Sequence, residues 1–105
     1  MDVYQVAIKL VALVAQLRLP RGHAATQDQL RRAVVSIALN IAEGCGKTGP
    51  DRRRFFEIAR GSTLESAAAL QILATFRAID PSTAGCGADY AQRIYAMLTR
   101  LTRQS

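Results

Sequence analysis

Three clusters of turn-forming residues divide the sequence into four segments, and this division constrains the fold more than any other feature. The two denser clusters cover residues 44–50 and 80–87, and a weaker one covers residues 19–23. Within each segment apolar residues recur at spacings of three and four, and no segment alternates apolar and polar residues as a half-buried strand does. The pattern predicts an all-α fold, an antiparallel up-down-up-down four-helix bundle formed as a single domain by residues 1–105.

The local signals predict where each helix begins and ends. The first helix is expected over about residues 3–18, and the second begins after Thr26, whose hydroxyl would form a capping box with Gln29. The third is expected to open at Pro50 and to continue over residues 50–79, and the fourth over about residues 89–102.

The second predicted helix is apolar on more than one side. Beside its main apolar line, further apolar side chains cover most of the remaining circumference: Val35, Ala38, Leu39 and Ala42. A helix of this kind must be covered on more than one face. We therefore expect it to be buried in a subunit interface as well as in the bundle, which makes the protein a homo-oligomer.

The third predicted helix carries a longer apolar line with a glycine in its middle. The residues of this line are Phe55, Ile58, Ala59, Ser62, Ala69, Ile72, Leu73 and Phe76. Arg53, Glu57 and Arg60 are expected on the outward face. Gly61 costs about 1 kcal/mol relative to alanine at such a position, a cost that close approach of a neighbouring helix would offset.

The supply of reactive side chains argues against an enzyme. The chain has one histidine and two cysteines, which excludes most metal sites and most nucleophile–histidine clusters. Cys45 and Cys86 are expected in loops at opposite ends of the bundle, about 40 Å apart, whereas a disulfide needs Cα atoms within about 7 Å. We expect no intrachain disulfide, no metal, no cofactor and no catalytic residues.

The sequence predicts a cytoplasmic protein with no membrane partner. No apolar stretch approaches the roughly 20 residues that a membrane-spanning helix requires. The first residues, Met1-Asp2, carry no basic region and no cleavage-like site of a secretory signal.

Polar residues interrupt the apolar lines of the second and third predicted helices. Antiparallel packing would bring the C-terminal half of one beside the N-terminal half of the other. We expect a buried polar network that joins these helices to each other or to a neighbouring subunit, formed by Ser36, Asn40, Glu43, Ser62 and Glu65. An alternative is a hydrolase that uses Glu43 and Glu65 as a carboxylate pair, which requires both to line an open cavity. With no neighbouring histidine and no metal set, the structural role is favoured.

A cluster of basic residues is the sharpest functional signal. Fourteen Lys and Arg oppose eight Asp and Glu, which gives a net charge of +6. Half of the basic residues fall within thirty consecutive positions: Arg31, Arg32, Lys47, Arg52, Arg53, Arg54 and Arg60. The bundle topology would bring Lys47 and residues 52–54 to one end, where they could neutralise the phosphates of RNA or DNA.

Two other interpretations of this basic cluster stay open. It could be a solvated face that keeps the protein soluble, or it could meet an acidic protein partner in an adaptor or structural oligomer. No aromatic residues interleave with the cluster on a visible surface, so stacking on single-stranded bases is not supported. The leading hypothesis is contact with the nucleic-acid backbone.

Several strings resemble one family. Residues 36–44 read S-I-A-L-N-I-A-E-G, similar to the signature S-I-P-S-N-I-A-E-G of the four-helix-bundle proteins encoded by intervening sequences in bacterial 23S ribosomal RNA genes. Residues 3–5, residues 29–33 and the stretch from Phe55 to Glu65 resemble the same family in order and spacing. The sequence departs from the signature at Ala38 and Leu39, which replace Pro and Ser, and Arg52 stands where an aromatic residue is common.

The resemblance implies an oligomeric protein without an established biochemical activity. The family is similar in fold to the accessory variability determinant of diversity-generating retroelements, a basic pentameric barrel that binds nucleic acid and a reverse transcriptase. The family resemblance implies that the chain assembles with other copies of itself in a homopentamer. The analogy in fold adds RNA or DNA and a nucleic-acid-processing protein as possible partners.

Overall fold

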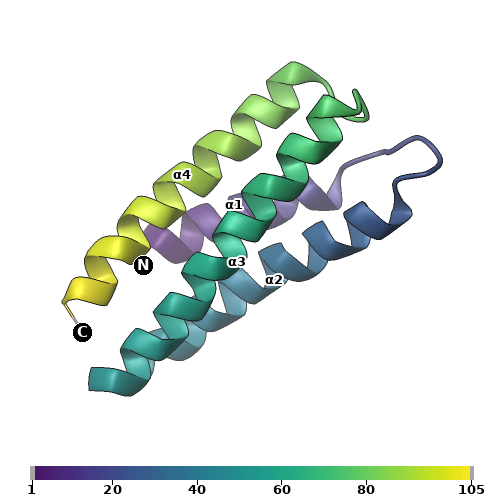
Figure 1. Ribbon diagram of the computed structural model, residues 1–105. Coiled ribbons are helices and arrows are strands. Elements are labelled where there is room, and N and C mark those ends of the chain that lie inside the picture. The colour runs from purple at the N-terminus through teal and green to yellow at the C-terminus, as the bar shows by residue number, and fades with distance from the viewer. Residues whose placement is uncertain (1, 105) are drawn as a thin grey trace.

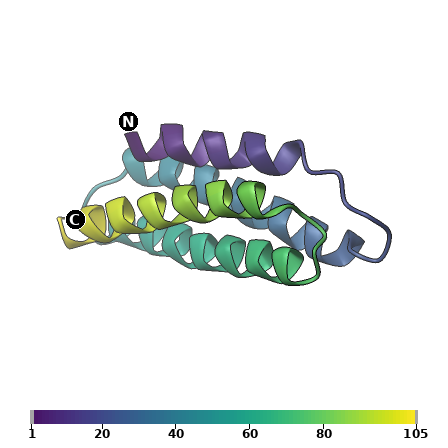
Figure 2. The ribbon, with the colours of Figure 1, turned by 90° about the horizontal axis from the view of Figure 1, so that it is seen from above.

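The computed structural model describes residues 2–104, which form four α-helices and no strand. These are α1 (Asp2–Ala15), α2 (Ala24–Cys45), α3 (Gly49–Thr75) and α4 (Pro81–Arg103). Successive helices run in opposite directions along one long axis (Figure 1), and the view from above shows the same arrangement (Figure 2). The all-α four-helix bundle predicted from the sequence is confirmed.

Each helix packs against two others, so that α1, α2, α3 and α4 follow one another around the bundle axis. The bundle measures 44 × 21 × 18 Å along its principal axes. The start of α1, the turn between α2 and α3 and the last turns of α4 share one end, called here the α2–α3 end (Figure 2). The loops 16–23 and 76–80 lie at the opposite end.

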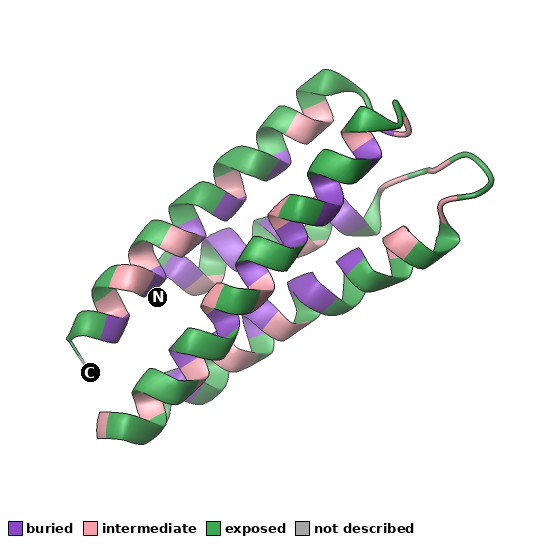
Figure 3. Ribbon diagram, in the orientation of Figure 1, coloured by how far each residue is buried: buried purple, intermediate pink, exposed green. Residues whose placement is uncertain are grey.

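The core is built from the helix faces that point toward the axis, visible as buried stripes in Figure 3. Its largest fully buried side chains include Leu10, Leu30, Ile37, Phe56, Leu73, Ile94 and Leu98. They recur at helical spacing on all four helices, as an amphipathic bundle requires.

The buried face of α3 differs from the predicted line. Phe56, Ala59, Leu70 and Leu73 are buried, whereas Ile58, Ile72 and Phe76 are exposed and Phe55 is half-buried. Ala69 is buried as well, and two further buried positions of α3 hold polar side chains, Thr63 and Ser66. Their hydroxyls donate to the carbonyl oxygens of Ala59 and Ser62 at 2.7 and 2.8 Å, so burial leaves neither hydroxyl unpaired.

The end of α3 is set by Arg77. This residue has a φ of 58°, and its N–H donates to the Ala74 carbonyl at 2.9 Å while the Ala78 N–H donates to the Leu73 carbonyl at 2.8 Å. These two bonds form a Schellman motif, which stops the helix at Thr75. The predicted continuation to Ile79 is wrong because an arginine occupies the left-handed position where a glycine would have signalled the end.

The starts of α2 and α4 also differ from the sequence predictions. α2 begins at Ala24 with His23 at its N-cap, and no side chain caps it, so the capping box of Thr26 and Gln29 is wrong. α4 begins at Pro81 rather than near Asp89, because the Asp80 carboxylate accepts the Thr83 N–H at 2.8 Å as the N-cap.

Close helix approach occurs at two glycines that the sequence analysis did not single out. A Cβ on Gly44 would lie 2.5 Å from Phe56 Cε1, and one on Gly87 would lie 2.7 Å from Leu70 Cδ1. Around Gly61, in contrast, a Cβ would meet nothing within 4 Å. Within the chain, therefore, no neighbouring helix approaches Gly61 closely enough to offset its cost.

Candidate nucleic-acid interface

Four members of the basic cluster gather at the α2–α3 end. Lys47 lies in the three-residue turn between the helices, and residues 52–54 lie in the first two turns of α3. The side chains of Lys47, Arg53 and Arg54 are exposed, while that of Arg52 is half-buried. The position expected for these four residues from the topology is the one that the structure shows.

Arg52 has a structural role at this end. Its guanidinium lies 4.8 Å from the centre of the buried Phe56 ring, and it donates to the Gly44 carbonyl at 3.4 Å. That carbonyl belongs to the last turn of α2, where a positive charge stabilises the helix dipole. Arg54 packs more loosely, with its guanidinium carbon 5.7 Å from the centre of the Phe55 ring.

Arg60 does not lie on the outward face as expected. Its guanidinium is 5.0 Å from the centre of the Tyr95 ring and donates to the Tyr95 hydroxyl at 3.0 Å. Its Nε is buried and has no hydrogen-bond partner. These contacts place Arg60 between α3 and α4, so it contributes charge to the cluster but little accessible surface.

Arg31 and Arg32 are exposed on α2, away from the α2–α3 end. Arg31 precedes Cys45 by fourteen residues, which is about 21 Å along a helix. Arg32 forms an exposed ion pair with Asp28 one turn earlier, an interaction that contributes little to stability. The seven basic residues therefore form a group of four at the α2–α3 end, a half-buried arginine of α3 that contacts α4, and a separate pair on α2.

The polar network between α2 and α3 is smaller than predicted. The hydroxyls of Ser36 and Ser62 lie 2.8 Å apart, and the Asn40 amide donates to the Ser36 carbonyl at 2.8 Å and to its hydroxyl at 3.1 Å. Glu43 and Glu65 are exposed, so their expected burial within the chain is wrong.

The bundle register keeps Glu43 and Glu65 apart. The Ser36–Ser62 contact places these two residues at the same height along the bundle axis. Glu43 lies seven residues from Ser36 toward the α2–α3 end, whereas Glu65 lies three residues from Ser62 toward the opposite end. The resulting separation is about 15 Å along the bundle axis. Pairs of carboxylates that cleave glycosidic bonds lie within about 9.5 Å, so these two do not form such a pair.

The cysteines are not joined by a disulfide, and both are exposed. Cys45 ends α2, whereas Cys86 lies within α4 rather than in a loop, because that helix starts earlier than predicted. The Cys86 side chain interacts with the Tyr90 hydroxyl, and this hydrogen bond raises the pKa of Tyr90.

Among residues 2–104, no three His, Cys, Asp or Glu side chains come close enough together to hold a metal ion. Nor does any helix of this part of the chain have the length and apolar character needed to cross a membrane.

Comparison with known families decides the relationship of this chain. The model of the 23S rRNA-intervening sequence protein family matches residues 1–100. The chain belongs to this family. The signature string of this 23S rRNA-intervening sequence protein lies on α2, where Ile37, Ile41 and Gly44 face the core and Ser36 and Asn40 face α3.

The fold of this chain agrees with that of a solved structure. A protein of unknown function from the S23 ribosomal protein family of Bacteroides thetaiotaomicron has a TM-score of 0.82, with 20% sequence identity over 96% of this chain and 95% of that one. At this identity the likeness shows the fold alone. A comparison with curated proteins gave no match.

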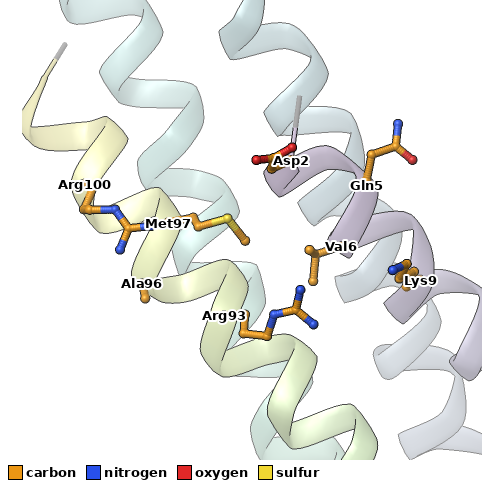
Figure 4. Close-up of a pocket in the computed structure, with 8 residues that line it drawn as sticks. All are labelled: Asp2, Gln5, Val6, Lys9, Arg93, Ala96, Met97 and Arg100. Carbon is orange, nitrogen blue, oxygen red and sulfur yellow. The ribbon is translucent and has the colours of Figure 1, made fainter.

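The sequence analysis missed a second group of cations in this chain. Lys9 of α1 and Arg93 and Arg100 of α4 line one groove between these helices (Figure 4). The two arginines are seven residues apart and thus share a helix face. That spacing was visible in the sequence, but the position of Lys9 opposite them depends on the register between α1 and α4.

Proposed function

We propose that this 23S rRNA-intervening sequence protein is a non-catalytic homo-oligomer that binds the backbone of RNA or DNA. The observation that carries the proposal is the group of exposed cations around the α2–α3 turn, Lys47, Arg53 and Arg54. They belong to a chain with a net charge of +6, which attracts polyanions over distances of a Debye length.

Phosphate groups are the chemistry that this surface fits. Arginine presents a planar fork of donors that matches two phosphate oxygens. Phe55 lies half-buried near Arg54, and Phe56 is fully buried, so these rings offer no open platform on which bases could stack. Binding through phosphates alone is independent of base sequence.

Assembly would strengthen this binding. α2 and α3 expose large apolar side chains, among them Leu39, which is 62% exposed, and Leu64, which is 56% exposed. Covering such residues against further copies of the chain would place several cation groups on one particle. Each group would then raise the effective concentration of nucleic acid near the others.

A titration of labelled RNA and DNA at several salt concentrations tests the proposal. The logarithm of the binding constant should fall linearly with the logarithm of salt, with a slope of about 0.7 to 0.9 per phosphate contacted. The double variant Lys47→Gln, Arg54→Gln should weaken binding to all sequences and reduce that slope by about 1 to 2.

The matched control removes the same charge at the opposite end of the bundle, in the double variant Arg18→Gln, Arg21→Gln. It should retain the slope of the unaltered protein. Absence of binding at low salt, a binding constant independent of salt, or equal losses in both double variants would each refute the proposal.

A further inference from the structure

The groove between α1 and α4 is separate from the cation group at the α2–α3 turn. It has a volume of about 500 Å³ and is lined by Asp2, Gln5, Val6, Lys9, Arg93, Ala96, Met97 and Arg100. Figure 4 shows Arg93 extending from α4 toward α1, beside Val6. The volume lies within the range of about 300 to 1,000 Å³ that small-molecule sites occupy.

The walls of this groove carry like charges. Lys9 stands on the α1 side, and Arg93 and Arg100 stand about 10 Å apart along α4. Asp2 is the one acid in the lining. Arg93 has an acidic partner in Asp89, but this residue lies on its own helix and at a distance of 3.9 Å. Facing cations repel one another, so an anion held between them would stabilise the pair of helices.

The floor of the groove is apolar. Val6 is buried and Met97 is half-buried, with Ala96 beside them. A methionine thioether packs well against an aromatic ring, and its flexible side chain adapts to a flat group. A ligand that fits this groove would carry a phosphate for the cationic walls and a planar ring for the apolar floor.

We propose that the α1–α4 groove binds a nucleoside phosphate, with the phosphate between Lys9 and the two arginines and the base against Val6 and Met97. The phosphate of this ligand can come from a free nucleotide or from the 5′ end of an RNA strand. The site uses no residue of the α2–α3 cation group, so it stands whether or not that group binds nucleic acid.

Isothermal titration of the full chain with adenosine 5′-monophosphate, adenosine and a short RNA with and without a 5′ phosphate tests the site. Adenosine 5′-monophosphate should bind saturably and adenosine should not. The double variant Lys9→Gln, Arg93→Gln should weaken binding about tenfold or more, as expected for lost charge-assisted hydrogen bonds. If the natural ligand is the 5′ end of an RNA strand, RNA with a 5′ phosphate should bind more tightly than RNA without one. The double variant should abolish this difference.

Two controls separate this proposal from the function proposed above. The variant Lys47→Gln, Arg54→Gln should bind adenosine 5′-monophosphate normally even if it loses RNA. Thermal unfolding without ligand should show the groove variant to be nearly as stable as the unaltered protein, because both side chains are exposed and the Arg93–Asp89 pair that is lost is exposed too. The proposal fails if neither phosphate ligand binds, or if the groove variant and the Lys47, Arg54 variant lose the nucleotide equally.

Discussion

Gly44 shows how a single position can fix the distance between two helices. It is buried in the last turn of α2, and the ring of Phe56 from α3 occupies the space where a side chain would lie. Phe56 is itself fully buried, so its ring cannot move aside without disturbing the core. The same ring supports the guanidinium of Arg52, which in turn donates to the Gly44 carbonyl.

Replacing Gly44 with alanine should therefore destabilise the fold. Overpacking a tight core costs about 1 to 3 kcal/mol, which exceeds the roughly 1 kcal/mol that alanine gains in helix propensity. Gly61→Ala is the matched control, because that glycine is exposed in the middle of α3 with open space around it, and it should stabilise by about 0.5 to 1 kcal/mol. Chemical unfolding of both variants measures the difference, and a stabilised Gly44→Ala protein would contradict the contact.

The four helices could be predicted from apolar spacing because that signal is repeated along each segment. Their ends depended on single residues. A stretch with Gly85 and Gly87 resembles a loop, yet it is helical because Gly87 packs against Leu70 and Asp80 caps the helix before it. Arg77 in the left-handed conformation carries no sequence signature, since glycine is the residue expected there.

The N-cap of α4 should make stability depend on pH. Hydrogen bonds from the Thr83 N–H, and next from the Ser82 hydroxyl, lower the pKa of Asp80 below its ordinary value of 3.8. A carboxylate with a lowered pKa stabilises the fold above its unfolded-state pKa, and this contribution is lost as the pH falls through the folded-state value. Asp80→Ala should thus lower the melting temperature by a few degrees at neutral pH.

Thermal unfolding over a pH series checks this expectation. The difference between the unaltered protein and Asp80→Ala should shrink as the pH drops below 3.8. Asp80→Asn keeps an acceptor for the Thr83 N–H but does not titrate, so its difference from Asp80→Ala should stay nearly constant with pH. A loss from Asp80→Ala that is the same at every pH would show that the charge has no role.

At the scale of the whole molecule, the sequence could predict the part of the candidate site whose residues are close together in the chain. It could not predict the parts that depend on how one helix is aligned against another. Lys47 and Arg54 lie within eight residues of each other, so any turn at this point brings them together. Arg60 was misplaced because its contact with Tyr95 joins positions 35 residues apart. The α1–α4 groove has Lys9 on one side and Arg93 on the other, an arrangement that follows only from how the bundle closes.

The exposed apolar surface of α2 should govern assembly. If the protein is a homo-oligomer, Leu39→Lys places a charge on that surface, and we expect the mass measured by light scattering to fall toward that of one chain. Ala12→Lys adds the same charge to the exposed face of α1 and should leave the mass unchanged. An unaltered protein that is monomeric, or a Leu39→Lys protein of unchanged mass, would exclude this surface as the interface.

The elongated shape of the bundle sets a limit on the footprint of one subunit. Its long axis of 44 Å corresponds to about thirteen base pairs of duplex at 3.4 Å each. The cations of the α2–α3 turn lie at one end of the long axis. A subunit that contacts a duplex with this end alone therefore covers far fewer than thirteen base pairs. If more than about thirteen base pairs are protected from nuclease, several subunits must bind side by side, and the number of subunits can be calculated from the protected length.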